Sequence, residues 1–177
     1  VAIPVSHTGR MLTQWIVPRA AANARWVGCD QGPGGPRDEC FRYDFDIPEA
    51  EWFYQKPSTD PTIYWVSISA WYMTSEPQQP FVWGWKTREH FFNDGAVRIL
   101  APNMPTPGME FAAGVPIQTA QDDIWDMAFV LTTRAPGPSK WDQWPNPDLP
   151  GLHAHDGITL ADNWECQGGA VTDLHWW

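Results

Sequence analysis

Apolar and charged side chains alternate strictly along the segment CFRYDFDI, which covers residues 40–47. From residue 41 onward the odd-numbered positions are aromatic or aliphatic, and the even-numbered positions are Arg or Asp. A period of two places all the apolar side chains on one face of an extended chain. The pattern therefore predicts a β-strand with one face in a core and the other toward water.

Other apolar stretches also predict strands rather than helices, because each is short and bounded by Pro, Gly or Asn. The segment 48–56 (PEAEWFYQK) opens with Pro and acidic residues and predicts one short helix. Asn93-Asp94-Gly95 carries the signature of a hairpin turn before a short strand. The expected further strands cover residues 11–18, 63–73, 80–87, 123–133, 158–167 and 170–177.

The composition supports an all-β protein. The 177 residues include 13 Trp, 8 Phe and 4 Tyr, together with 18 Pro and 14 Gly, whereas charged residues make up 18%. Aromatic strands separated by Pro/Gly turns favour sheets over helices. We expect an antiparallel β-sandwich of the jelly-roll kind, with one short helix and long Pro/Gly-rich loops.

The formal net charge of -10 argues against nucleic acid and anionic membrane surfaces as partners, since both require clustered Lys and Arg. No stretch of about 18 apolar residues occurs, so no membrane insertion is expected. The first residues lack the layout of a secretory signal. For an exported protein, that signal would have been removed or would lie upstream.

Residues 134–157 contain many Pro residues and have the composition of a linker or docking arm. We therefore expect an incomplete sandwich unit over residues 1–133 and the opening strands of a next or complementing unit over residues 158–177. The last strand ends in apolar residues where chain ends usually fray. We expect it to pair with a sheet supplied by another copy or by sequence outside this chain, through Ala170, Val171, Leu174, Trp176 and Trp177.

Three cysteines leave one without a partner in any disulfide scheme. Cys29 and Cys40 bracket a Gly/Pro loop, and a disulfide closing it would stabilise the fold by about 3 kcal/mol on the chain-entropy model. Cys166 is then a candidate for a bridge to another chain, or a competitor for Cys40. The alternative is three reduced, buried thiols.

Four segments follow one another along the chain: CFRYDFDIPEAEWFYQ, TIYWVSISAWY, GWKTREHFFNDGAVRI and DMAFVLTT. In this order they resemble the second half of a repeated β-domain of large secreted proteins of planctomycete-like bacteria. The segment 140–177 is similar to its opening half. The resemblance covers most of residues 38–177, implies an extracellular or cell-surface location, and supplies no catalytic residues.

The order of these halves suggests the end of one repeat followed by the start of the next. An incomplete sandwich exposes strand edges, which favours pairing with another unit. We therefore expect a non-catalytic structural protein that forms a filament or surface array by strand complementation. Its partners would be copies of itself or neighbouring repeats.

Candidate metal ligands are few. His153, His155 and Asp156 alternate as ligands on one strand face would, but an exposed loop explains them equally. Asp122, Asp123 and Asp126 can supply oxygens to calcium, although a charged turn before the next strand is the simpler interpretation. No cofactor is expected, with calcium as the open alternative. Asp162 and Asp173 are assigned hydrogen bonds that fix turns.

No nucleophile elbow or phosphate-binding Gly loop occurs, so an enzyme is not expected. The main alternative is a carbohydrate-binding module, because flat Trp rings stack on sugars and the Trp content is high. Trp83 and Trp85 share a strand face, and Trp71 can join them as a sugar platform; Trp176 or Trp177 is a further candidate. The competing explanation is that these rings pack in the core or between subunits.

Overall fold

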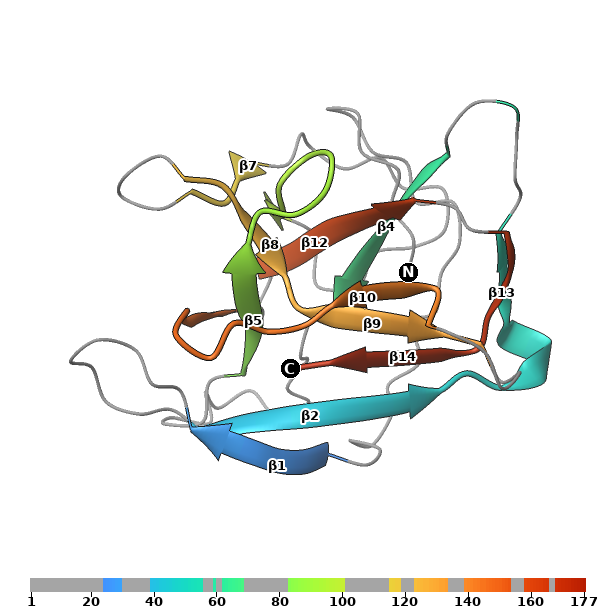
Figure 1. Cartoon of the computed structure of the whole chain (residues 1–177), viewed down its shortest axis with the longest axis horizontal. Helices are drawn as coiled ribbons and strands as arrows, with labels where there is room; N and C mark the ends of the chain where they lie inside the picture. Colours follow the sequence, from blue (N-terminus) through green and yellow to red (C-terminus); the bar gives the residue numbers. More distant parts are fainter. Residues whose placement is uncertain are drawn as a thin grey trace.

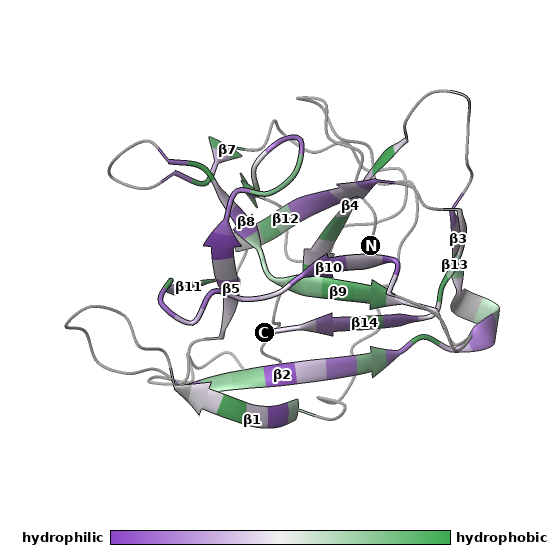
Figure 2. Cartoon of the chain, viewed as in Figure 1, coloured by the Kyte–Doolittle hydropathy of each residue, from purple (hydrophilic) through white to green (hydrophobic). Residues whose placement is uncertain are grey.

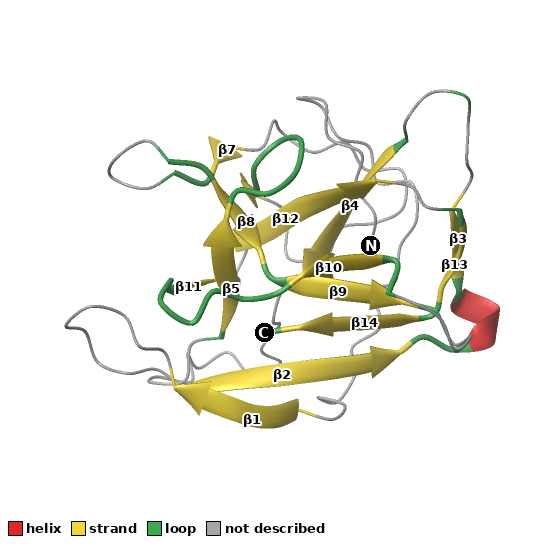
Figure 3. Cartoon of the chain, viewed as in Figure 1, coloured by secondary structure: helices red, strands yellow, loops and turns green. Residues whose placement is uncertain are grey.

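The computed structural model describes residues 24–29, 39–55, 59, 62–68, 83–100, 115–118, 123–133, 139–153, 158–165 and 168–177. Nearly all of these residues lie in strands or in the short connections between them (Figure 3). Every strand pair among them is antiparallel. The expected all-β, sandwich-like fold is thereby confirmed.

The largest sheet has five strands and lies along the lower half of the molecule in the view of Figure 1. In spatial order it contains β1 (Ala24–Cys29), β2 (Glu39–Asp46), β14 (Asp173–Trp176), β9 (Phe129–Thr132) and β10 (Trp141–Gln143). The alternating segment 40–47 forms most of β2. Ile47, the last apolar residue of the alternation, directly follows the strand and is buried.

Three smaller sheets complete the described part of the chain. One contains β11 (Gly151–His153), β5 (Gly84–Glu89) and β8 (Trp125–Met127). Another contains β4 (Ile63–Ile68), β12 (Ile158–Glu165), β6 (Val97–Leu100) and β7 (Val115–Pro116). The last pairs β13 (Gly169–Val171) with β3 (Phe53–Gln55).

The expected short helix is a single 3-10 turn, η1 (Glu49–Glu51), between β2 and β3. Pro48 precedes it and the amide of Trp52 donates to the carbonyl of Glu49, closing the turn. In the described residues no helix has the length and apolar character needed to cross a membrane.

The core lies where the sheets face one another. Phe129 and Leu131 come from the five-stranded sheet, Leu160 and Trp164 from β12, and Trp85 from β5. Aromatic rings pack against one another within it: the ring of Phe129 lies 6.2 Å from that of Trp85, tilted by 58°, and 6.4 Å from that of Trp164, edge to face. Such geometry adds to the stabilisation that apolar burial provides.

The strands near the end of the chain lie in the middle of sheets, which differs from the expected division at residue 134. β14 is hydrogen-bonded to β2 on one side and to β9 on the other, and β12 lies between β4 and β6 (Figure 1). Residues 158–177 therefore complete the sheets of residues 24–133 within one chain. Pairing inside a chain has a high effective concentration, so it competes well with pairing between copies.

The residues expected at an assembly interface are accordingly used inside the molecule. Ala170 and Val171 pair with β3, while Leu174 and Trp176 pair with both β2 and β9. Trp177 is buried, and its carbonyl oxygen accepts a 2.7 Å hydrogen bond from the amide of Lys86. Neither edge of β14 is available to another copy in this arrangement.

Two stretches expected to be single strands are each divided between sheets. Residues 123–133 leave β8 and enter β9 at Ala128, whose amide donates to the carbonyl of Lys86 at 2.9 Å. Residues 170–177 change sheet at Thr172, whose amide donates to the carbonyl of Thr132 at 3.0 Å. Because a continuous apolar run does not specify its partner strands, only the tertiary fold sets these breaks.

The Asn93-Asp94-Gly95 turn is a corner rather than a hairpin. Asn93 has a φ of 52°, as the motif predicts, but β5 before it and β6 after it belong to different sheets. Gly95 is required here because a Cβ atom would lie 1.7 Å from the Cγ2 atom of Ile124. The expected strand over residues 11–18, and residues 69–73 of another, lie outside the described residues.

We expect Phe129→Ala to lower the free energy of unfolding by about 3–5 kcal/mol, because the ring is fully buried between Trp85 and Trp164. Phe91→Ala, at an exposed ring, should change it by less than about 1 kcal/mol. Urea denaturation of both variants measures the difference, and equal effects would contradict this description of the core.

Candidate functional site

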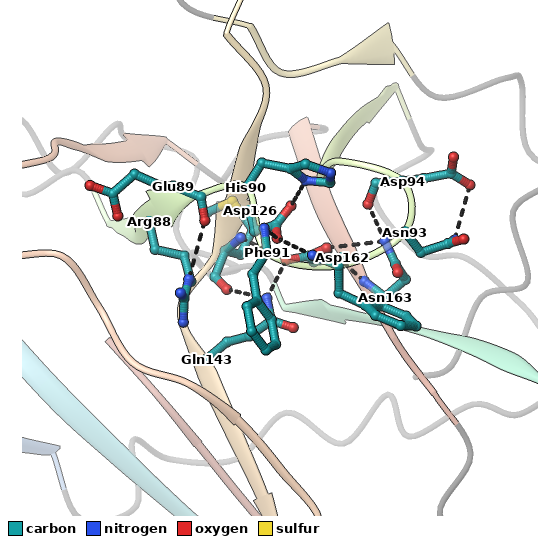
Figure 4. Close-up of polar contacts among 12 residues, drawn as sticks. Arg88, Glu89, His90, Phe91, Asn93, Asp94, Asp126, Gln143, Asp162 and Asn163 are labelled. Carbon is teal, nitrogen blue, oxygen red and sulfur yellow. Dashed lines mark hydrogen bonds and ion pairs between the residues drawn. The ribbon is translucent and has the colours of Figure 1, made fainter.

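Two buried carboxyl groups form the most unusual polar feature of the described fold. Asp126 lies on β8 and Asp162 lies in the middle of β12, and both are at most 1% exposed (Figure 4). Buried carboxyl groups are rare unless they are paired or hydrogen-bonded. Each therefore needs an account of its partners.

Asp126 fixes the segment that follows β5. Its Oδ2 atom accepts hydrogen bonds from the amides of Phe91 at 2.6 Å and Phe92 at 3.3 Å. Its Oδ1 atom lies 3.0 Å from Nδ1 of His90, whose side chain is 37% exposed. His90 is thus the partner of this carboxylate that reaches water.

Asp162 joins β12 to two neighbouring strands. Its Oδ2 atom accepts hydrogen bonds from the amide of Met127 at 2.7 Å and from Nε2 of Gln143 at 2.9 Å, while its Oδ1 atom accepts from the amide of Asn163 at 2.7 Å. Gln143 is itself buried and also donates to the carbonyl of Met127 at 3.0 Å. The carboxyl group therefore connects β12, β8 and β10.

The protonation of Asp162 follows from its surroundings. Burial raises the pKa of its carboxyl group well above the usual range, and the nearby charge of Asp126 raises it further. The amide and Gln143 hydrogen bonds act in the opposite direction but do not outweigh burial. A carboxyl group with a raised pKa can act as a general acid, but only in contact with a substrate. At 1% exposure, Asp162 is placed to hold strands together.

The sequence analysis missed this network. It placed both residues within the expected strands 123–133 and 158–167, but interpreted Asp126 as part of a charged turn and gave Asp162 a hydrogen bond that fixes a turn. In the structure both carboxyl groups, on β8 and β12, instead accept hydrogen bonds from other segments. The available signal was that Asp162 shares a strand face with the apolar residues Leu160 and Trp164. Asp173, also assigned a turn, begins β14 and accepts a 3.0 Å hydrogen bond from Oγ1 of Thr132.

A second polar cluster lies across β2 and β14. Asp44 and His175 are opposite each other in the strand register, and Nδ1 of His175 lies 2.6 Å from Oδ1 of Asp44. Nε of Arg42 donates to the same oxygen at 2.6 Å. Burial raises the pKa of Asp44, but the hydrogen bonds from His175 and Arg42 outweigh it and leave that pKa lowered.

An aromatic group continues from this cluster. The guanidinium carbon of Arg42 lies 5.7 Å from the ring centre of Trp177, within the range of a cation–π interaction. The ring of Trp177 lies 5.2 Å from that of Trp144. Trp177 is buried, whereas Trp144 is 54% exposed. An indole ring therefore reaches water beside a buried ring and an arginine.

The expected sugar platform is not formed as a surface. Trp85 is fully buried, and its indole N–H donates to the carbonyl of Ala128 at 2.7 Å. Trp83 is half-buried and contacts the ring of Tyr43 at 6.3 Å. Trp71 lies outside the described residues. Trp83 precedes β5 and packs against the core cluster that contains Trp85.

The expected disulfide is not supported. No disulfide is seen among the residues that the structure describes. The register of β1 and β2 sets Cys29 opposite Glu39 and Cys40 opposite Gly28, so the two cysteines are not register partners. The bond between them stays a prediction, and Cys166 lies outside the described residues.

The candidate metal ligands are not brought together in the described part of the chain. There, no group of three His, Cys, Asp or Glu side chains is arranged to hold a metal ion. Asp123 is exposed and His153 ends β11, while Asp122, His155 and Asp156 lie outside the described residues. Calcium binding by these residues stays a prediction.

Comparison with known proteins gives one match. A family model described as a domain of unknown function (DUF7901) matches residues 2–132 and 139–177. Neither the curated proteins nor the solved structures contain a significant match.

We expect the stability of the protein to depend on pH through Asp162. A raised folded pKa means that the protonated group favours the fold at low pH, and that this contribution is lost as the pH rises through the raised value. Asp162→Asn removes the titrating group, so the free energy of unfolding should decrease less with rising pH. The disturbed hydrogen bonds should lower the free energy of unfolding by about 1–3 kcal/mol. Denaturant unfolding across pH measures the effect.

The control for this prediction is Asp148→Asn, which changes an exposed carboxylate in a loop. Its pH dependence of stability should match that of the unmodified protein. If Asp162→Asn also leaves the pH dependence unchanged, the raised pKa of Asp162 is wrong.

Proposed function

The chain belongs to the DUF7901 family of domains of unknown function, and we propose that it is a non-catalytic structural module of an extracellular or cell-surface protein. It associates with another copy by adding strand to strand at the edge of β1 that no described strand covers. The extracellular location is supported by the resemblance of its sequence to repeats of large secreted proteins.

The edge of β1 is the observation that carries this proposal. Among the described strands β1 pairs with β2 alone and forms the lower border of the five-stranded sheet (Figure 1). An outer strand presents backbone N–H and C=O groups that can pair with a further strand. Since β12 and β14 are paired on both sides, strand addition is better supported here than at the last strand.

The side chains of β1 add to the case for association. Trp26 is 57% exposed and Val27 is 44% exposed, and β1 carries both hydrophobic and hydrophilic segments (Figure 2). The register shifts between Trp26 and Gly28, so Val27 has no register partner on β2. Such a bulge redirects a side chain. Two neighbouring apolar side chains are thus exposed, and Arg25 is the only charged residue of the strand.

A second copy of β1 is the partner that fits this edge. The strand has six residues, and its centre falls between Trp26 and Val27. In an antiparallel pair about that centre, Trp26 of one copy would face Val27 of the other. Aromatic and β-branched side chains stabilise each other across strands. Where a protein contains several such modules, this contact would join modules of neighbouring molecules.

We expect the protein to self-associate reversibly, and Trp26→Lys to weaken the association about tenfold or more. Losing the burial of a large side chain costs about 1.5–3 kcal/mol, and each 1.4 kcal/mol is a factor of about ten in Kd. Sedimentation equilibrium over a range of concentrations measures the dissociation constant of both proteins.

Trp144→Lys is the matched control, because Trp144 is exposed to a similar extent as Trp26 but lies in the connection after β10 rather than on β1. It should leave the dissociation constant unchanged, and circular dichroism should show that both variants are folded. A protein that stays monomeric at all concentrations, or equal weakening by both substitutions, would disprove association through β1.

A further inference from the structure

The backbone on both sides of Trp144 is held in place. Trp144 directly follows β10, which is paired with β9. The loop after it is fixed to β5: the amide of Asn146 donates to the carbonyl of Thr87 at 3.3 Å, and Oγ1 of Thr87 donates to the carbonyl of Pro150 at 2.6 Å. An exposed side chain between two fixed segments loses little freedom on binding a ligand.

The loop carries further internal support. Nδ2 of Asn146 donates to Oε1 of Glu89 at 2.5 Å, and the amide of Asp148 donates to Oδ1 of Asn146 at 2.8 Å. These bonds tie the loop both to β5 and to itself. The backbone that presents Trp144 is thus structured, although more than half of its side chain faces water.

One neighbour supports the indole ring from inside. The ring of Trp177 is buried, lies 5.2 Å from Trp144 and is tilted by 52° to it. Packing against a fixed ring restricts the orientation of Trp144. A flat aromatic surface of defined orientation remains open to a ligand.

Polar groups that can bind hydroxyls continue from this aromatic pair. Arg42 lies over the ring of Trp177, and its partners Asp44 and His175 extend the cluster across β2 and β14. The side chains of Arg42, Asp44 and His175 are 24%, 29% and 16% exposed. Guanidinium groups donate hydrogen bonds and carboxylates accept them. Both kinds of group are therefore partly accessible, and Trp177 is the shared neighbour of Arg42 and the exposed ring of Trp144.

We propose that Trp144, together with the Arg42–Asp44–His175 cluster, binds a neutral polysaccharide. A sugar ring has an apolar C–H face that stacks on an indole and a rim of hydroxyls that needs donors and acceptors. A single exposed ring beside charged groups suits this ligand better than an apolar protein surface, which would need a wider apolar patch. The net charge of -10 disfavours acidic polymers.

This site differs from the platform expected from the sequence and does not depend on association through β1. Trp83 and Trp85 pack inward, whereas Trp144 faces water. The exposed Trp26 lies on β1, the outer strand of the five-stranded sheet, and the register of β1 and β2 pairs it with Phe41. The two exposed tryptophans therefore serve as controls for each other.

Native affinity electrophoresis in gels containing mixed-linkage β-glucan, xyloglucan or galactomannan tests the proposal, with alginate as the acidic polymer. The protein is loaded at concentrations at which sedimentation shows a monomer. We expect at least one neutral polymer to retard the unmodified protein, and Trp144→Ala to reduce that retardation at least fivefold. Arg42→Gln should reduce it less, because it leaves the ring in place.

Trp26→Ala is the control, because it removes an indole of similar exposure. This variant should migrate like the unmodified protein in each gel. Thermal unfolding should show that all variants are folded. Three outcomes would overturn the proposal: no retardation by any neutral polymer, retardation by alginate alone, or retardation that Trp144→Ala leaves unchanged. If Trp26→Ala reduces retardation as much as Trp144→Ala, the binding surface is β1 instead.

Discussion

The insertion of β12 and β14 between other strands is the constraint on which the described fold depends. Each strand hydrogen-bonds on both edges, β12 to β4 and β6 and β14 to β2 and β9. Leu160 and Trp164 on β12 are buried in the same core as Phe129 and Leu131 on β9. The earlier strands would otherwise have open edges and an uncovered apolar face, so the two late strands close two sheets at once.

The buried polar network reinforces this insertion. A buried apolar face opposes a register slip of one residue, because that slip would turn the apolar side chains to water, but a slip of two residues keeps them in the core. Asp162 requires donors wherever it is buried, and Met127 and Gln143 supply them at one position of β12 only. Asp126 does the same for the segment after β5. Burying these carboxyl groups costs free energy, but it favours one strand register over the others.

The surface consequences follow from the same arrangement. Because the late strands are used internally, β1 is left as the outer strand of the largest sheet, with Trp26 and Val27 exposed. Trp177 at the end of β14 packs under Arg42 and against Trp144, which brings an exposed ring next to the Arg42–Asp44–His175 cluster. The proposed association and the proposed sugar binding therefore use separate surfaces created by one topology.

The sequence by itself determined the local structure: the period of two in β2, the β-rich class, the turn at Pro48 and the left-handed Asn93 all follow from local side-chain and backbone preferences. Tertiary structure decided which strands meet. The break at Ala128, the corner at Gly95, the inward direction of Trp85 and the burial of Asp162 depend on partners about 30 to 45 residues away, or on which sheet each strand enters. Alternation shows that a strand has an apolar face, but only packing determines what that face covers and which rings remain in water.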